Sequence, residues 1–160
     1  MKISNKTDYA LLALFTLLEV PDGKPISARE ISARNKIPLK FLEHILREMK
    51  EQGWVESVSG KYGGYLLARK PGKISIGEVV RHFDGLLGPS PCVSVSCQEG
   101  TCPHESTCRF RWLFQDIQSY AIKLLDSSTL ESVAKGPPSS NTRAAKSSKR
   151  RSLKNPIATS

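Results

Sequence analysis

Apolar positions near the start of the chain predict a central helix. The run from Tyr9 to Leu18 is apolar on nearly every side, which is typical of a helix buried in the middle of a domain. Asn5 is placed to cap this helix, and Pro21-Asp22-Gly23 ends it after about fifteen residues. We therefore expect the first helix to form the centre of the core.

Two further helices follow. Ser27 and Glu30 have the spacing of a capping box and open a short helix with Ile31 facing inward. Pro38 suits the first turn of a third helix, and Gly53 is placed to end it. Its apolar positions recur at helical spacing: Leu39, Leu42, Ile45, Leu46 and Met49. Its other face carries Lys40, Phe41, Glu43, His44, Arg47 and Lys50.

The pattern then changes from helical spacing to alternation. Residues 54–58 alternate apolar and polar positions, residues 59–64 form a glycine-rich turn, and residues 65–68 return, which predicts a β-hairpin. Ser75 and Glu78 form a second capping box, which starts a short helix that ends at about Phe83.

A long helix is predicted to begin near Cys108. Its apolar positions form one stripe over four turns: Phe110, Leu113, Phe114, Ile117, Tyr120, Ala121, Leu124 and Leu125. No later segment is available to cover this stripe, which favours pairing with a second subunit. The alternative is that the helix packs back on its own domain. Ser128 and Glu131 are placed to cap a short terminal helix.

Three helices followed by a hairpin are the element order of a winged helix-turn-helix. We therefore expect a mainly α fold with a small β-hairpin wing and a long C-terminal dimerisation helix. Residues 1–84 would form the DNA-binding domain, residues 85–108 a cysteine-rich loop and residues 109–135 the dimerisation helix with a short terminal helix. Residues 136–160 would form a disordered basic tail.

The charge of the chain is concentrated in that tail. The 160 residues carry a formal net charge of +9, from 24 basic and 15 acidic side chains. Six of the basic residues and none of the acidic ones follow Gly136, so the first 135 residues have a net charge of only +3. The tail is suited to sequence-independent contact with phosphates, or it keeps the protein in solution.

The N-terminus has a superficial likeness to a secretion signal. However, Asp8 interrupts the approach to the apolar run, Glu19 follows it, and no small-residue cleavage site is present. The run is also too short to cross a bilayer. We expect a cytoplasmic protein without a membrane partner, in which thiols serve metal or redox chemistry rather than permanent disulfides.

The third helix and the hairpin carry candidate DNA-binding residues. In a winged helix the first turn of the third helix faces the bases, which places Lys40, Phe41, Glu43 and His44 there. Lys40 can reach a phosphate or a guanine, and Glu43 can accept from cytosine, although Glu43 also suits an ordinary solvated helix face. At the hairpin tip three glycines allow a close approach to another surface, and Lys61 adds a positive charge.

All four cysteines of the chain lie between residues 92 and 108, with the spacing Cys-x4-Cys-x4-Cys-x5-Cys. Their neighbours are Gly, Pro, Ser and Glu, so they read as ligands or as a redox switch rather than as core residues. Structural zinc sites favour Cys-x2-Cys pairs, which are absent, although zinc in a four-cysteine loop stays open. A Cys–His nucleophile built from Cys102 or Cys108 with His104 lacks an orienting third group, so we do not expect an enzyme.

Several motifs together resemble the IscR-type (Rrf2) family of bacterial transcription regulators. The resemblance covers about residues 1–134. Its motifs are Met1-Lys2-Ile3-Ser4 with Tyr9-Ala10, Ala28-x-x-Ile31-Ser32, the stretch from Pro38 to Leu46, and Gly60-Lys61-Tyr62-Gly63-Gly64-Tyr65-x-Leu67-Ala68. It implies a homodimeric winged-helix repressor or activator that binds double-stranded DNA at a palindromic operator. Members with cysteines before the dimer helix often carry an iron–sulfur cluster and sense iron–sulfur status, nitric oxide or redox state.

The resemblance also implies a ligand set. Cys108 and Cys102 fit the last two cluster ligands, and Cys97 fits the first better than Cys92 does. Asp8 is the first candidate for the fourth ligand, reaching across from the partner subunit, with Cys92 and His104 as the others. An acid at this place is also explained by the helix dipole. The resemblance leaves open whether the cluster is 2Fe–2S or 4Fe–4S.

Two positions depart from the family pattern. Ser59 replaces an arginine that the family often has at the wing, and Arg111 replaces the histidine ligand of the 2Fe–2S member. We take the DNA-binding residues to be Lys40, Phe41, Glu43, His44, Arg47, Ser59, Lys61 and Tyr62. Some members of the family lack a cluster, so a regulator that uses a thiol switch, zinc or a partner protein is the alternative.

Overall fold

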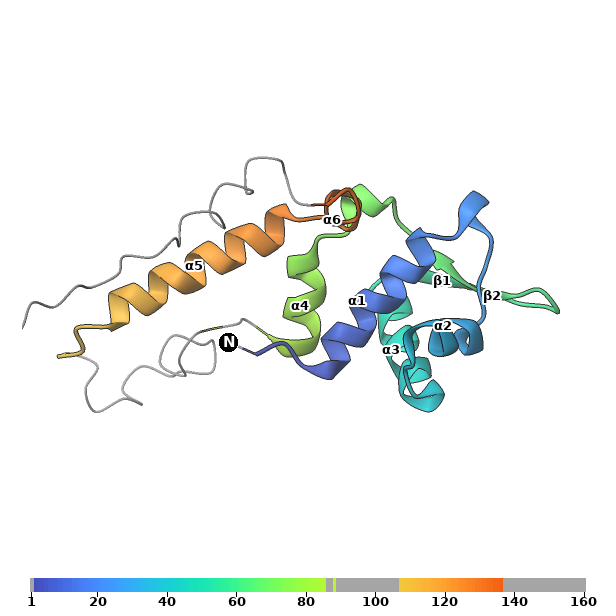
Figure 1. Cartoon of the computed structure of the whole chain (residues 1–160), viewed down its shortest axis with the longest axis horizontal. Helices are drawn as coiled ribbons and strands as arrows, with labels where there is room; N and C mark the ends of the chain where they lie inside the picture. Colours follow the sequence, from blue (N-terminus) through green and yellow to red (C-terminus); the bar gives the residue numbers. More distant parts are fainter. Residues whose placement is uncertain (1, 86–87, 89–106, 137–160) are drawn as a thin grey trace, which may run out of the picture.

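Helix α1 (Asn5–Leu18) runs through the centre of the core (Figure 1). This computed structural model describes residues 2–85, 88 and 107–136 of the chain. Ala10, Ala13, Leu14 and Leu17 of α1 are buried, and the helix packs against α2, α3, α4 and β2. The cap expected at Asn5 is wrong by one residue, because the Ser4 side chain accepts the Thr7 backbone N–H.

Helices α2 (Ala28–Asn35) and α3 (Leu39–Glu51) form the helix-turn-helix (Figure 1). Between them Lys36 adopts a left-handed backbone conformation with a φ of 55°, which residues other than glycine rarely take. Helix α3 ends as expected at Gly53, whose φ is 68°. There the Trp54 N–H bonds to the Met49 carbonyl and the Gly53 N–H to that of Lys50, both at 3.0 Å, which is a Schellman motif.

Strands β1 (Val55–Val58) and β2 (Gly64–Leu67) form the antiparallel hairpin, with Val55 opposite Leu67 and Val58 opposite Gly64. The structure adds a contact that the sequence pattern did not indicate. Ile26, after the short 3-10 helix η1 (Pro21–Gly23), exchanges two backbone hydrogen bonds with Tyr65, at 3.0 and 2.9 Å. The approach to α2 therefore fastens one edge of the wing.

Helix α4 (Ile76–Asp84) follows the 3-10 helix η2 (Pro71–Lys73). The expected capping box is present, because Ser75 accepts the Glu78 N–H and the Glu78 carboxylate accepts the Ser75 N–H. Val79 and Val80 are buried against the core that α1 organises. Helices α1–α4 and the hairpin together form the head of the molecule, and α4 closes the side of the head that faces α5 (Figure 1).

Helix α5 (Arg111–Ser127) meets α4 only near its C-terminal end, and its N-terminal half extends away from the head (Figure 1). It begins three residues after Cys108, later than expected. Gly77 of α4 lies so close to Asp126 that an added Cβ would collide with it. No helix among the described residues is long and apolar enough to cross a membrane.

The chain then returns to the head. The short helix α6 (Leu130–Ala134) places Leu130 at zero exposure in the core. Backbone hydrogen bonds join Ile76 N–H to the Ser128 carbonyl at 2.7 Å and Leu130 N–H to the Ile74 carbonyl at 3.0 Å. The expected cap at Ser128 is wrong by one residue, since Thr129 and Ser132 form the capping box.

Candidate nucleic-acid interface and regulatory segment

One face of α3 is polar and open. Lys40, Glu43, His44 and Arg47 are all exposed, on the side opposite the buried apolar stripe of Leu42, Ile45, Leu46 and Met49. The stripe fixes the rotation of the helix, so these four side chains share one outward surface. Lys40, His44 and Arg47 can donate hydrogen bonds to phosphates and base edges, and the Glu43 carboxylate can accept one from a base edge.

Phe41 lies at the border of this polar face rather than at its centre. Its ring is 39% exposed and meets the Tyr9 ring of α1 edge to face, with centroids 5.9 Å apart and an interplanar angle of 81°. Part of Phe41 therefore packs against α1. The rest of the ring is available at the edge of the polar face.

The end of α3 is joined to the wing by a contact that sequence reasoning missed. The Lys50 ammonium donates to the Ser57 hydroxyl of β1 at 2.6 Å. Both side chains are exposed, and nothing in their spacing along the chain indicates that they meet. The contact joins the C-terminal end of α3 to the first strand of the wing.

The wing tip presents a positive charge beside an aromatic ring. Ser59, Lys61 and Tyr62 are exposed, and Tyr62 is 83% exposed. The Lys61 ammonium lies 5.5 Å from the centroid of the Tyr62 ring. The turn requires glycine, because Gly60 has a φ of 117° and a Cβ on Gly63 would collide with the Val58 carbonyl.

Behind α3, three helices meet at Glu48. Its carboxylate lies 2.8 Å from the Lys6 ammonium of α1 and 3.6 Å from Nε2 of His82 in α4. These three side chains are about one-third exposed, between 27% and 37%. These three residues could not be grouped from the sequence, because they are 34 or more residues apart in the chain and each is of a type common on protein surfaces.

The end of α4 is also tied to the start of α1. One oxygen of the Asp84 carboxylate accepts the Ser4 backbone N–H at 2.9 Å and the Thr7 hydroxyl at 2.8 Å. Burial raises the pKa of Asp84, but hydrogen bonds from Ser4 and Thr7 together outweigh it and leave the pKa below its ordinary value. The ionised carboxylate thus caps the first turn of α1 from another helix.

Only two of the candidate cluster ligands belong to the described residues. Cys108 is half-buried and precedes by two residues Phe110, the N-cap of α5. Asp8 is exposed in the first turn of α1. Cys92, Cys97, Cys102 and His104 lie outside the described residues. Within those residues, no group of three His, Cys, Asp or Glu side chains is arranged to hold a metal ion.

The apolar stripe of α5 is largely open. Phe110, Leu113, Ile117, Tyr120 and Leu124 are between 40% and 71% exposed, and no residue of the helix is buried by the rest of the chain as described. The other three residues of the stripe, Phe114, Ala121 and Leu125, are half-buried, and Leu125 packs against the core near the end of the helix. A contiguous stripe of five exposed large apolar side chains is typical of an interaction surface.

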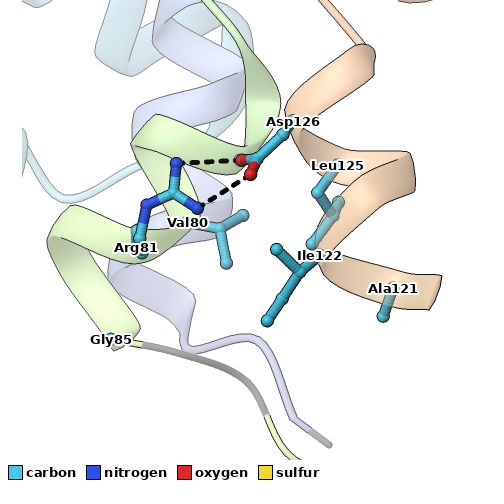
Figure 2. A pocket seen from close by; sticks show the side chains of 8 residues that line it. Val80, Arg81, Gly85, Ala121, Ile122, Leu125 and Asp126 are labelled. Atoms are coloured by element: carbon cyan, nitrogen blue, oxygen red, sulfur yellow. Dashed lines mark hydrogen bonds and ion pairs between the residues drawn. The ribbon is translucent and has the colours of Figure 1, made fainter. Parts of the chain in front are cut away.

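The contact between α4 and α5 encloses a small hollow (Figure 2). Figure 2 shows Arg81 and Asp126 joined at two points beside Val80, Ile122 and Leu125, with N–O distances of 3.1 and 2.9 Å. The hydrogen bond with Asp126 raises the pKa of Arg81, and burial opposes it only in part. The cavity volume is about 10 Å³, room for one water molecule, so this site braces two helices rather than binding a ligand.

Comparison of the sequence with models of known protein families identifies one family. The Rrf2 family model, described as an iron-dependent transcriptional regulator, matches residues 3–136. An HTH-type transcriptional regulator, rrf2-like, of Rhodobacter capsulatus is 38% identical over 142 residues, covering 85% of this chain and 95% of that protein.

Two solved structures share the fold. CymR of Bacillus subtilis, described as the global cysteine regulator, superposes with a TM-score of 0.68 at 29% identity, covering 86% of this chain and 99% of CymR. IscR of T. potens superposes with a TM-score of 0.64 at 27% identity, covering 84% and 87%. The family is one of regulators and not of enzymes, and its solved members are winged helix-turn-helix proteins, as expected from the sequence. The chain belongs to the Rrf2 family of DNA-binding transcriptional regulators.

Proposed function

We propose that this protein is a homodimeric, sequence-specific DNA-binding regulator, acting in the cytoplasm, whose affinity for DNA changes with the state of an iron–sulfur cluster. The observation that carries the proposal is the placement of all four cysteines within 17 residues, ending just before the N-cap of α5. The segment that would hold the cluster thus connects the DNA-binding head to the helix with the open apolar stripe.

DNA recognition is assigned to α3 and the wing. The outward face of α3 would enter the major groove, where Lys40, His44 and Arg47 reach phosphates or guanine and Glu43 accepts from cytosine. The wing would bring Lys61 and Tyr62 to the adjacent backbone or minor groove. In this arrangement residues 1–84 bind DNA, residues 85–108 sense, residues 109–135 dimerise and residues 136–160 add a basic tail.

Dimerisation is assigned to α5. A two-fold axis along the stripe would cover its apolar residues with the same residues of a second copy. Two α3 helices would then face DNA at a fixed separation of about 34–36 Å, one turn of the double helix. A palindromic operator is the expected target, because its two halves repeat with the same symmetry.

The residues present fit an iron–sulfur cluster. Thiolates are the usual ligands of such clusters, and Cys97, Cys102 and Cys108 supply three. Cys108 is half-buried and lies at the N-terminal approach to α5. Asp8 would supply the fourth ligand from the partner, with Cys92 or His104 as alternatives. When bound, the cluster would supply a centre that reacts with oxidants or nitric oxide.

The test is anaerobic purification followed by a visible absorption spectrum, with counts of iron and acid-labile sulfide. A brown protein with matched iron and sulfide, which loses both in Cys102→Ala and Cys108→Ala, is the expected result. Cys92→Ala should keep its colour, because Cys97 is the better first ligand and Asp8 is the first candidate for the fourth. Loss of colour in Cys92→Ala would instead make Cys92 a ligand. Asp8→Ala then tests the fourth position.

A second candidate is a regulator without a cluster, which senses through a thiol switch, zinc or a partner protein. The likeness to CymR, at a TM-score of 0.68, favours keeping it. Colourless protein after cluster reconstitution would select this candidate. Zinc content and the mass change on oxidation would then separate zinc from a disulfide.

A further inference from the structure

Two sets of polar contacts join the first turn of α1 to α4 and to α3. Asp84, the last residue of α4, accepts hydrogen bonds from Ser4 and Thr7. Lys6, in the same turn of α1, forms an ion pair with Glu48 of α3. The first turn of α1 therefore contacts both the end of α4 and α3.

A second route joins the same elements directly. His82, two residues before Asp84, lies 3.6 Å from the Glu48 carboxylate. Its ring and that of Phe83 meet edge to face at 4.7 Å, and the Lys6 ammonium lies 5.1 Å from the centroid of Phe83. Buried Trp54 packs against both rings at 5.4 and 6.2 Å. Both routes end at Glu48.

The group formed by Lys6, Glu48 and His82 lies between the point where the chain leaves the head and the polar face of α3. The residue after Asp84 is Gly85, with a φ of 74°, where the chain leaves the head toward the cysteine segment. Glu48 lies on α3 one turn beyond His44 of the polar face. A group that is joined to both the exit of the head and the α3 helix can transmit a shift from one to the other.

We propose that Glu48 is a positioning residue for DNA recognition, which couples the end of α4 and the first turn of α1 to the orientation of α3. Lys6 and His82 are its partners, and the Asp84–Thr7 hydrogen bond is the contact at the α4 end. The inference rests on the assignment of α3 as the DNA-reading helix, and it does not require an iron–sulfur cluster.

The test is a double-mutant cycle on DNA affinity with the full-length protein. Glu48→Gln removes the charge at similar size, and Thr7→Val removes the hydroxyl that donates to Asp84. An operator selected from random duplexes and a scrambled duplex of equal length are the two probes. Thr7→Val should weaken operator binding about 3- to 10-fold and should have little further effect in the Glu48→Gln background.

Two controls separate positioning from charge and from stability. Glu51→Gln removes the same charge from the same helix, at an exposed residue one turn further on, and should leave the coupling intact. Binding to the scrambled duplex should be nearly unchanged in Thr7→Val, whereas partial unfolding would weaken binding to both probes. Asp84→Ala removes the acceptor of the same contact and gives the cycle a second, independent measurement.

Additive effects of Thr7→Val and Glu48→Gln would overturn the inference, and so would equal effects of Glu48→Gln and Glu51→Gln. In both cases selective operator binding by the unaltered protein would leave the proposed function standing. Failure of the unaltered protein to prefer any selected duplex would instead remove the proposed function, and this inference with it.

Discussion

At the wing, backbone carbonyls lie so close to two glycines that no side chain fits there. A Cβ on Gly63 would collide with the Val58 carbonyl, and one on Gly64 with the Ile26 carbonyl. From the sequence, the three glycines of the turn were expected to allow a close approach to another surface. Gly64 makes such an approach to the backbone of Ile26, which lies in a distant part of the chain that no local pattern identifies.

Gly64→Ala should therefore destabilise the protein by about 1–3 kcal/mol, because the carbonyl it meets belongs to a paired backbone that cannot shift freely. Urea unfolding measures the change. Gly72→Ala is the matched control, since its Cβ would meet only the flexible end of Glu131. Equal stability of the two variants would contradict the expected backbone contact.

Asp84 makes the stability of the head depend on pH. Its pKa is lowered in the folded state, so its ionised form stabilises the fold above the ordinary value near 3.8, and this contribution is lost as the pH falls through the folded-state pKa. The difference in unfolding free energy between the native protein and Asp84→Asn should be constant from about pH 5 to 7 and shrink below about pH 4. A difference that grows toward acid pH would refute the assignment, and Asp116→Asn is the exposed control.

Caps illustrate what residue types alone leave undecided. Asn5 and Ser4 are both good N-caps, and the contacts of Asp84 with Ser4 and Thr7 decide in favour of Ser4. Thr129 likewise replaces Ser128, because the Ser128 carbonyl is already bonded to Ile76 of α4. The helices themselves were predictable from their apolar spacing, whereas their first residues depended on tertiary contacts.

At the scale of elements, α5 has two distinct apolar surfaces. Ile122 and Leu125 face α4 and the apolar stripe is open, whereas Ser119 is an exposed polar residue outside the stripe. The stripe was evident from sequence because its spacing is regular. The start of the helix was not, because Phe110 provides no side-chain cap and so leaves no signal.

Ile117→Glu should convert the proposed dimer to a monomer. Burying an isoleucine contributes about 1.5–3 kcal/mol, and a two-fold axis counts it twice, so the dimer dissociation constant should rise at least about 100-fold. Sedimentation equilibrium measures the change. Ser119→Glu adds the same charge at an exposed position outside the stripe and should stay dimeric. If both variants remain dimers, the interface lies elsewhere.

At the scale of the whole molecule, charge is divided between residues 1–135, with a net charge of +3, and the basic residues that follow Gly136. Deleting residues 137–160 removes six positive charges and no negative ones. The slope of log affinity for DNA against log salt should fall by up to about 5, with the preference for the operator over a scrambled duplex unchanged. An unchanged slope would mean that the tail serves solubility alone.

The order of elements and the family were readable from the whole sequence, but the joint at Glu48 was not. Apolar spacing reports which face of a helix is buried, and glycine motifs report where the backbone needs freedom. Neither reports which polar side chains on different helices meet. Lys6, Glu48 and His82 come together only because α1, α3 and α4 cross near one another.

The return of the chain to the head after α5 has a consequence for how the protein is made. Leu130 fills the core of the head, and backbone pairing at Ser128 and Leu130 closes it, yet these residues follow α5. During synthesis the head therefore stays incomplete until α5 has left the ribosome. Each newly finished DNA-binding head already carries the helix proposed to find its partner, so folding and assembly can proceed together.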